Sequence, residues 1–390
     1  MSSVIIIAGA GVGGLALAQG LLRHGIETVV YERDAALASR RQGYRLHLDA
    51  AARDALHRVL PAGPAALFDA TAGTPAARFT LLNNTFRVLF AQESEGPAYA
   101  VDRLTLRSVL LSGIEDRVRF ATAVTGFRMD DDGVTVDLAD GTTARGDVLV
   151  GADGINSVVR RRYLPHARVV ETGVWQIYGR IPLTAETRNL FDDTMFGVFT
   201  MIAGPDGTFL GVAPVEFPEN PAAAAARLTP SGRPLPAATD YMTCSFGARA
   251  EWFGPTRDRL LTLPGPDLHT IVATAVRDWH PRARALVAAC APDSLFALPL
   301  RTSVPIPPWP TTRTTLLGDA IHAMTPASGS GACTALRDAA TLTEALTTNG
   351  PLDAVRDYER RMIDYGFAAV RAGAADGERF LGQDPLPAGV

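Results

Sequence analysis

The chain contains no lysine, so all 37 basic residues among its 390 are arginines. Mechanisms that need a side-chain amine, such as Schiff-base formation or lysine-assisted halogenation, are therefore excluded. A biased composition explains the missing lysine, and the chemical exclusion holds whatever its cause.

Cysteine is scarce. Cys244, Cys290 and Cys333 are widely separated and odd in number, and no C-x₂₋₄-C pair occurs. This spacing disfavours a disulfide reductase and a zinc site, and it predicts reduced thiols in a cytoplasmic protein. We therefore expect no metal centre.

Uninterrupted hydrophobic runs and a strong charge of one sign are also missing. Val4–Leu22 is uncharged and long enough for a transmembrane helix, but five glycines interrupt it and no basic region precedes it. With a net charge of −4 and 47% hydrophobic residues, the composition predicts a globular protein without a nucleic-acid or membrane partner.

The stretch Val4–Asp34 has the order strand, tight turn, helix, strand, acid. Its glycines Gly9, Gly11 and Gly14 have the spacing G-x-G-x-x-G, and Glu32 follows twenty-one residues after Gly11. In a βαβ unit such glycines allow a sharp turn, a close approach of backbone to a pyrophosphate, and packing of the helix on the strand. A carboxylate at this distance accepts hydrogen bonds from a ribose. The stretch predicts a dinucleotide site.

The remaining pattern predicts an α/β fold with two interleaved domains. We expect a doubly wound, Rossmann-like domain from residues 1–75, 101–173 and 285–390, the last including C-terminal helices. A smaller antiparallel-sheet domain is expected from an excursion at residues 76–100 and from residues 174–284. Val101–Leu111 is predicted to be one amphipathic helix.

Two further motifs place acids in glycine-rich turns after predicted strands. Residues 150–160 read VGADGINSVVR, with Asp153 in the turn before a helix. Residues 316–322 read LLGDAIH, with Asp319 at the end of a strand, and a second glycine-rich helix start follows. Each motif alone indicates little more than a turn.

Together the three motifs resemble those of the class A flavoprotein monooxygenases, which share the para-hydroxybenzoate hydroxylase fold. G-x-G-x-x-G, GADG-x-x-S-x-V-R and GDA-x-H…P-x-x-G-x-G occur in that family's order and spacing and span essentially the whole chain. The resemblance implies FAD as a tightly held cofactor and NADPH or NADH as co-substrate. It also implies an active site between the two domains.

The resemblance assigns cofactor contacts to individual positions. It implies that the three motif glycines meet the pyrophosphate, that Glu32 and Arg33 lie at the adenosine ribose, and that Asp319 binds the ribityl chain. The other implied FAD-binding residues are Arg103, Val124, Asp153, Pro326, Gly329, Gly331 and Ala332. A helix N-terminus at Gly331 would favour negative charge on reduced flavin.

Four further positions either depart from the family's pattern or allow an alternative role. Cys333 stands where relatives often have asparagine, so one polar contact near the flavin is missing or made by backbone. Ser328 stands where relatives often have glycine, a change that would tune the flavin position. Arg45 and His47 alternate on a predicted strand beside the isoalloxazine position. Arg45 is a candidate contact to flavin or substrate, with a surface arginine as the alternative. His47 is a candidate catalytic base, with a structural histidine as the alternative.

Four aromatic residues of the smaller domain are candidates for the substrate pocket, although core packing explains them equally well. They are Tyr178, Phe196, Phe209 and Phe246.

The reaction that the resemblance implies is insertion of one oxygen atom from O₂, through a flavin C4a-hydroperoxide, into an aromatic or polyketide-like small molecule of secondary metabolism. Hydroxylation, epoxidation and Baeyer–Villiger insertion stay open because they share that hydroperoxide. Two alternatives are a flavin-dependent reductase or dehydrogenase of an unsaturated molecule and a non-catalytic flavin- or ligand-binding protein. We expect a monomer or a loose homodimer.

Overall fold

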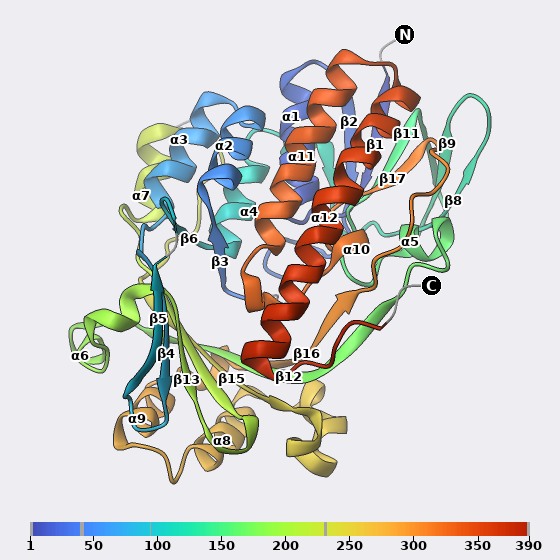
Figure 1. Ribbon diagram of the computed structural model, residues 1–390. Helices are drawn as coiled ribbons and strands as arrows, with labels where there is room; N and C mark the ends of the chain where they lie inside the picture. The colour runs from blue at the N-terminus through green and yellow to red at the C-terminus, as the bar shows by residue number, and fades with distance from the viewer. Residues whose placement is uncertain (1–2, 40–42, 94, 230–231, 388–390) are drawn as a thin grey trace.

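A five-stranded parallel sheet lies at the centre of the larger part of the molecule (Figure 1), with the strand order β17–β11–β1–β2–β7. The computed structural model describes residues 3–39, 43–93, 95–229 and 232–387. The strands are β1 (Val4–Ala8), β2 (Glu27–Tyr31), β7 (Val118–Arg119), β11 (Val148–Gly151) and β17 (Thr314–Leu316). Ile5, Ile6 and Ile7 are fully buried, because both faces of this sheet are covered.

Helices and a small antiparallel sheet complete the larger part. Helix α1 packs against α2, α4 and α11, and the strand order of the small sheet is β10–β9–β8. The helices are α1 (Val12–Arg23), α2 (Ala50–Val59), α3 (Ala62–Thr71), α4 (Arg103–Leu111), α5 (Val158–Tyr163), α10 (Asp319–His322), α11 (Gly331–Thr348) and α12 (Pro351–Leu381). The strands of the small sheet are β8 (Val124–Met129), β9 (Val134–Leu138) and β10 (Thr143–Gly146).

A seven-stranded sheet in the order β16–β12–β15–β14–β13–β4–β5 forms the smaller part. Its strands are β4 (Ala76–Asn83), β5 (Val88–Glu93), β12 (Val169–Pro182), β13 (Gly197–Ala203), β14 (Phe209–Val215), β15 (Tyr241–Arg249) and β16 (Phe296–Ser303). The short helices of this region are α6 (Ala185–Arg188), α7 (Pro221–Leu228), α8 (Gly265–Ala275) and α9 (Pro281–Ala288).

The two faces of the seven-stranded sheet have different neighbours. One face packs against α8, α9 and the 3₁₀ segment Ala250–Thr262. The other turns toward the larger part, where Val174, Met201 and Phe209 form a cluster with Leu381 of α12. In Figure 1, α8 and α9 lie on the side of the sheet away from α11.

The expected α/β fold with a parallel sheet and a separate, largely antiparallel sheet is confirmed. Three details differ from expectation. Strand β4 runs parallel to β13, and β16 joins the seven-stranded sheet although it falls within residues 285–390. Residues 99–102 form strand β6 (Tyr99–Asp102), paired with β3 (Arg45–Leu48), so helix α4 begins only at Arg103. Asp102 caps that helix by accepting the Thr105 N–H at 2.8 Å.

No helix in the described part of the chain has the length and apolarity needed to cross a lipid bilayer.

Candidate active site at the carboxyl end of the parallel sheet

The three motifs follow three neighbouring strands of the parallel sheet. Strand β1 pairs with β11, and β11 pairs with β17, all in parallel register. Their carboxyl ends therefore meet at one edge, which is where ligands bind in open α/β sheets. Arg160 of the second motif ties two of the turns together, because its Nη1 donates to the Ala320 carbonyl at 2.9 Å and its Nη2 to the Ile155 carbonyl at 2.9 Å.

Different constraints require glycine at the three positions of the first motif. Gly9 has φ +110°, and a Cβ there would lie 2.4 Å from the Ala152 carbonyl oxygen. A Cβ at Gly14 would lie 2.1 Å from the Gly9 oxygen. At Gly11 the backbone is extended, and among the described residues a Cβ there would meet only the Ala152 carbonyl oxygen, 4.0 Å away. Packing therefore does not require glycine at position 11, whereas close approach of a ligand does.

Glu32 holds the glycine turn from the end of β2. Its buried carboxylate accepts the Ala10 N–H at 2.7 Å and the Asp34 N–H at 2.9 Å. Each oxygen keeps a lone pair for a further donor, such as a ribose hydroxyl. Arg33, next in the chain, is exposed.

Arg107 is a buried contact to this turn that the sequence analysis missed. Its Nε and Nη2 donate to the Ala10 carbonyl at 3.1 and 2.9 Å, and its Nη1 donates to the Leu37 carbonyl at 2.9 Å. Arg103 lies one turn earlier on α4, and its backbone N–H donates to the Tyr44 carbonyl at 2.7 Å. The spacing of four residues on one helix is the only sequence signal for Arg107.

Asp153 supports the second turn. One carboxylate oxygen accepts the Val158 N–H at 2.7 Å and the Val159 N–H at 3.3 Å, at the start of α5. The other oxygen is buried and has no partner in the described part of the chain. Burial raises the pKa of this carboxyl, against the lowering effect of those hydrogen bonds.

Asp319 differs from the other motif acids. It is exposed at the start of α10 and makes no side-chain hydrogen bond to any described residue. The residue before it, Gly318, has φ +60°, and its N–H is held by Asp338 at 2.8 Å. The Asp338 side chain thus fixes the turn, and the Asp319 carboxylate stays available to a ligand.

Helix α11 begins beside this turn without a side-chain cap. Ser330 occupies the N-cap position but provides no capping hydrogen bond, and Gly331 and Ala332 are only partly buried. Gly329 precedes it with φ +66°, and Pro326 is exposed in the 3₁₀ segment Pro326–Ser328. An eighteen-residue helix with an open N-terminus favours an anion or a developing negative charge.

Strand β3 lies between this helix start and the seven-stranded sheet. Arg45 donates from Nε to the Pro214 carbonyl on β14 at 2.9 Å, and a Cβ at Gly329 would lie 3.3 Å from the His47 ring. Burial lowers the pKa of Arg45 to about 10. Burial, and then the charge of Arg45, lower the pKa of His47 to about 4, against the attraction of Asp49. At neutral pH, Arg45 is charged and His47 is neutral.

The structure separates the four aromatic candidates. Tyr178 and Phe209 lie on the face turned toward the larger part: Tyr178 stacks on Phe296 with ring centroids 5.7 Å apart, and the Phe209 ring covers Gly247. Phe246 lies on the opposite face, with its centroid 5.1 Å from that of Trp252, in the cluster under α8 and α9. We therefore correct the expectation for Phe246 and leave it out of the proposed site.

Phe196 lies beside a surface pocket, at the end of the 3₁₀ segment Asp193–Phe196. The Arg188 guanidinium lies 4.5 Å from its ring centroid, and the pocket has a volume of about 460 Å³. Phe196 also packs at the edge of the cluster under α8 and α9, so it too is left out of the proposed site. Val124, the first residue of β8, is buried.

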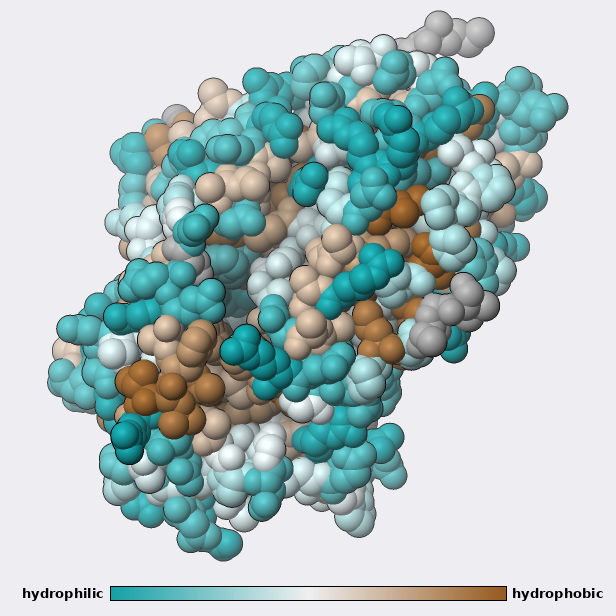
Figure 2. Space-filling model, viewed as in Figure 1, coloured by the Kyte–Doolittle hydropathy of each residue, from teal (hydrophilic) through white to brown (hydrophobic). Residues whose placement is uncertain are grey.

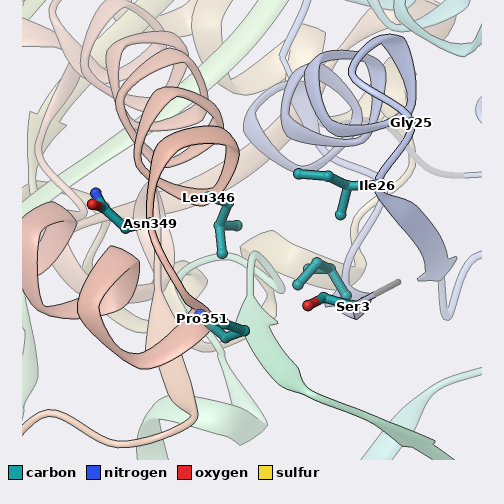
Figure 3. A pocket seen from close by; sticks show the side chains of 7 residues that line it. Ser3, Gly25, Ile26, Leu346, Asn349 and Pro351 are labelled. Atoms are coloured by element: carbon teal, nitrogen blue, oxygen red, sulfur yellow. The ribbon is translucent and has the colours of Figure 1, made fainter. Parts of the chain in front are cut away.

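Two hollows of the molecule lie at different distances from the motif turns. Figure 2 shows the molecule hollowed between the helices of the larger part and the seven-stranded sheet, on the side of the motif turns. A cavity of about 220 Å³ lies instead at the amino end of β1, where Ser3 and Ile26 face Leu346 and Pro351 (Figure 3). Because parallel strands bind ligands at their carboxyl ends, this second cavity is not the candidate site. No cluster of metal-binding side chains occurs in the described residues.

Known proteins share this architecture. Residues 1–225 and 300–351 match the family described as FAD binding domain. The dual O-methyltransferase/FAD-dependent monooxygenase CTB3 of Cercospora beticola is 30% identical over 418 residues, which cover 99% of this chain and 47% of that protein. The chain thus spans about half the length of this relative.

Other relatives match over nearly their full length. The FAD-dependent monooxygenase thnD of Trichoderma harzianum is 27% identical over 417 residues, covering 98% of this chain and 95% of that protein. A crystal structure assigned as an FAD-containing monooxygenase of Photorhabdus luminescens superposes with a TM-score of 0.84 at 29% identity, covering 97% of this chain and 99% of that one.

Proposed function

This chain belongs to the FAD-binding-domain family of class A flavoprotein monooxygenases, and we propose that it inserts one oxygen atom from O₂ into an aromatic or polyketide-like small molecule, with NADPH or NADH as electron donor. The observation that carries the proposal is the meeting of three motif turns at one sheet edge, where each leaves polar groups open to a ligand.

The residues at this edge fit FAD. The space beside Gly11, into which a Cβ would project, suits a pyrophosphate at the N-terminus of α1. Glu32 is held by two backbone N–H groups at a place that suits the adenosine ribose, and the free carboxylate of Asp319 suits the ribityl chain. The open N-terminus of α11 suits the flavin edge where charge develops on reduction.

The remaining assigned contacts have weaker support. Arg103, Val124, Pro326 and the exposed Arg33 stay proposals that rest on the family pattern alone. Asp153 supports the site through the turn that it holds, and its buried free oxygen leaves one acceptor for the cofactor or the nicotinamide.

FAD held by these residues would supply the redox chemistry between NAD(P)H and O₂. The protein's own residues would hold the cofactor, orient the substrate and exclude water from the site. The open N-terminus of α11 would stabilise negative charge on a ligand there, and β3 contacts both α11 and the seven-stranded sheet. His47, with its low pKa, acts there as a neutral hydrogen-bonding group, so we no longer propose it as a base at neutral pH.

Substrate is proposed to bind between β3 and the seven-stranded sheet. Tyr178, stacked on Phe296, supplies aromatic surface on the sheet, and Arg45 and His47 supply polar groups opposite. Phe209 shares the face of Tyr178 but is 1% exposed and packs in the cluster with Leu381, so it is left out of the proposed site. A flat molecule with oxygen substituents suits such a space.

The test is incorporation of isotopically labelled O₂ into product during NAD(P)H-dependent turnover. One labelled oxygen atom per product molecule is expected. Substrate reduction without label would favour the reductase alternative, and flavin binding without NAD(P)H consumption would favour the non-catalytic one.

A further inference from the structure

Arg45 points out of the core of the larger part. Within β3, Leu48 is fully buried in that core and Leu46 packs against it. Because side chains alternate along a strand, Arg45 and His47 share the opposite side, toward the seven-stranded sheet. The hydrogen bond from Arg45 Nε to the Pro214 carbonyl confirms this direction.

One buried nitrogen of the Arg45 guanidinium, Nη2, lacks a hydrogen-bond partner in the described part of the chain. The acid opposite it in the β3–β6 register is Asp102, and both oxygens of that carboxylate are engaged. Oδ1 accepts from Thr105, and Oδ2 accepts the Tyr241 hydroxyl at 2.9 Å.

An incompletely paired buried cation is costly to a fold. Arg45 also forms no ion pair with any described carboxylate, unlike many surface arginines such as Arg145, which pairs with Asp130 at 2.7 Å. A ligand that brings an acidic oxygen to Nη2 would satisfy this nitrogen with a charge-assisted hydrogen bond.

His47 repeats the pattern two residues later. Its Nδ1 is buried and has no partner in the described part of the chain. Because the ring is neutral at neutral pH, it offers a hydrogen bond without adding a second positive charge. Two unused buried nitrogens on one side of a strand indicate a polar ligand.

We propose that Arg45 sets the substrate class of this enzyme by binding an acidic oxygen of the aromatic substrate, with His47 bonding a neighbouring hydroxyl or carbonyl. This rests on the proposed function, because it places the substrate between β3 and the seven-stranded sheet. Beyond the proposed function, we expect that neutral aromatic molecules of the same shape bind poorly.

Binding of a matched pair of probes to the holoenzyme tests the proposal. The probes are 1-hydroxy-2-naphthoate and its methyl ester, and the readout is the perturbation of the bound-flavin spectrum. The wild type should bind the acid about tenfold or more tightly than the ester, since a charge-assisted hydrogen bond contributes at least that much. In Arg45→Gln this preference should disappear through loss of acid binding.

Arg180→Gln is the matched control. Arg180 is exposed, and its guanidinium lies over the rings of Tyr44 and Tyr241 at 5.3 and 5.8 Å from their centroids. This variant should keep the preference for the acid. Equal binding of the two probes by the wild type, including no binding of either up to their solubility limits, would contradict the proposal.

Two further readouts separate ligand binding from other roles. If Arg45 serves a ligand, Arg45→Met should unfold at the same or a higher temperature than wild type, and a clear fall would show a structural role instead. FAD content should stay at the wild-type level in Arg45→Gln, and FAD loss would assign Arg45 to the cofactor. A wild-type protein that takes up no FAD would contradict the proposed function itself.

Discussion

His322 Nε2 and Asp338 Oδ2 lie 2.7 Å apart, and both side chains are almost completely buried. The same carboxylate accepts the Gly318 N–H at 2.8 Å and the Tyr365 hydroxyl at 2.7 Å. One buried acid therefore connects α10, α11 and α12 and holds the turn that presents Asp319.

Removing the charge of Asp338 should destabilise the protein strongly. Burial acts to lower the pKa of His322, but the charge and hydrogen bond of Asp338 outweigh it and the pKa is raised from 6.5. Asp338→Asn should cost about 3–5 kcal/mol, because it leaves a buried partner unpaired. Tyr365→Phe, which removes one bond to the same acid, should cost only about 1.5–3 kcal/mol. Urea unfolding measures both, and equal small losses would contradict the account.

This pair also predicts a pH dependence. A histidine whose pKa is raised by folding contributes stability fully below pH 6.5, and the contribution is lost as pH rises through the folded value. The difference in unfolding free energy between wild type and His322→Gln should therefore shrink as the solution becomes alkaline. A difference that grows with pH would refute the ion pair.

Glu359 on α12 gives a separate pH prediction. Burial raises its pKa from 4.5 to about 7, although Thr315, Trp309 and Thr311 donate hydrogen bonds to it. Its contribution to stability is full below pH 4.5 and is lost as pH rises through about 7. Relative to Glu359→Gln, the wild type should lose about 3 kcal/mol over that range. A pH-independent difference would show that the carboxyl titrates normally.

Two alanine substitutions in the first motif should separate folding from cofactor binding. Gly11→Ala should fold normally, because a Cβ there meets no described atom closer than 4.0 Å, but should bind FAD weakly. Gly14→Ala should fail to fold stably, because its Cβ would lie 2.1 Å from the Gly9 oxygen. Circular dichroism and FAD titration report the two properties. Wild-type FAD affinity in Gly11→Ala would contradict the placement of the pyrophosphate.

Asp319→Ala should lower FAD affinity without loss of stability, since its exposed carboxylate bonds to no described residue. The lost hydrogen bond should weaken binding by about 1–3 kcal/mol. Asp364→Ala, another exposed acid on α12, is the control and should bind FAD like wild type. The assignment of Asp319 to the ribityl chain would be rejected by full affinity in Asp319→Ala.

The sequence predicted the part of the site that depends on local pattern. The turns after β1, β11 and β17 carry fixed glycine and acid spacings, and each follows a strand, as the pattern predicts. Neighbouring parallel strands then bring their turns together without further information.

The residues that the sequence missed depend on long-range geometry. In β15 the apolar Met242, Cys244 and Phe246 alternate with small or polar residues, so the pattern groups Phe246 on one face. It does not tell which face of the sheet the site uses, and the structure places Phe246 on the face away from it. Strand β16 contains Pro299, which argues against a strand, and the sheet tolerates it because β16 is an edge strand. Arg107 reaches across 97 positions to Ala10. Its helical spacing from Arg103 indicates a shared helix face but does not predict this contact.

The most direct test of the central claim is the absorbance spectrum of the purified protein after FAD is added and excess is removed, followed by anaerobic NADPH or NADH and then air. We expect bound-flavin bands that bleach with nicotinamide, faster with substrate present, and return in air. A protein that stays colourless after exposure to FAD would contradict the site at the carboxyl end of the parallel sheet, and with it the proposed oxygenase function.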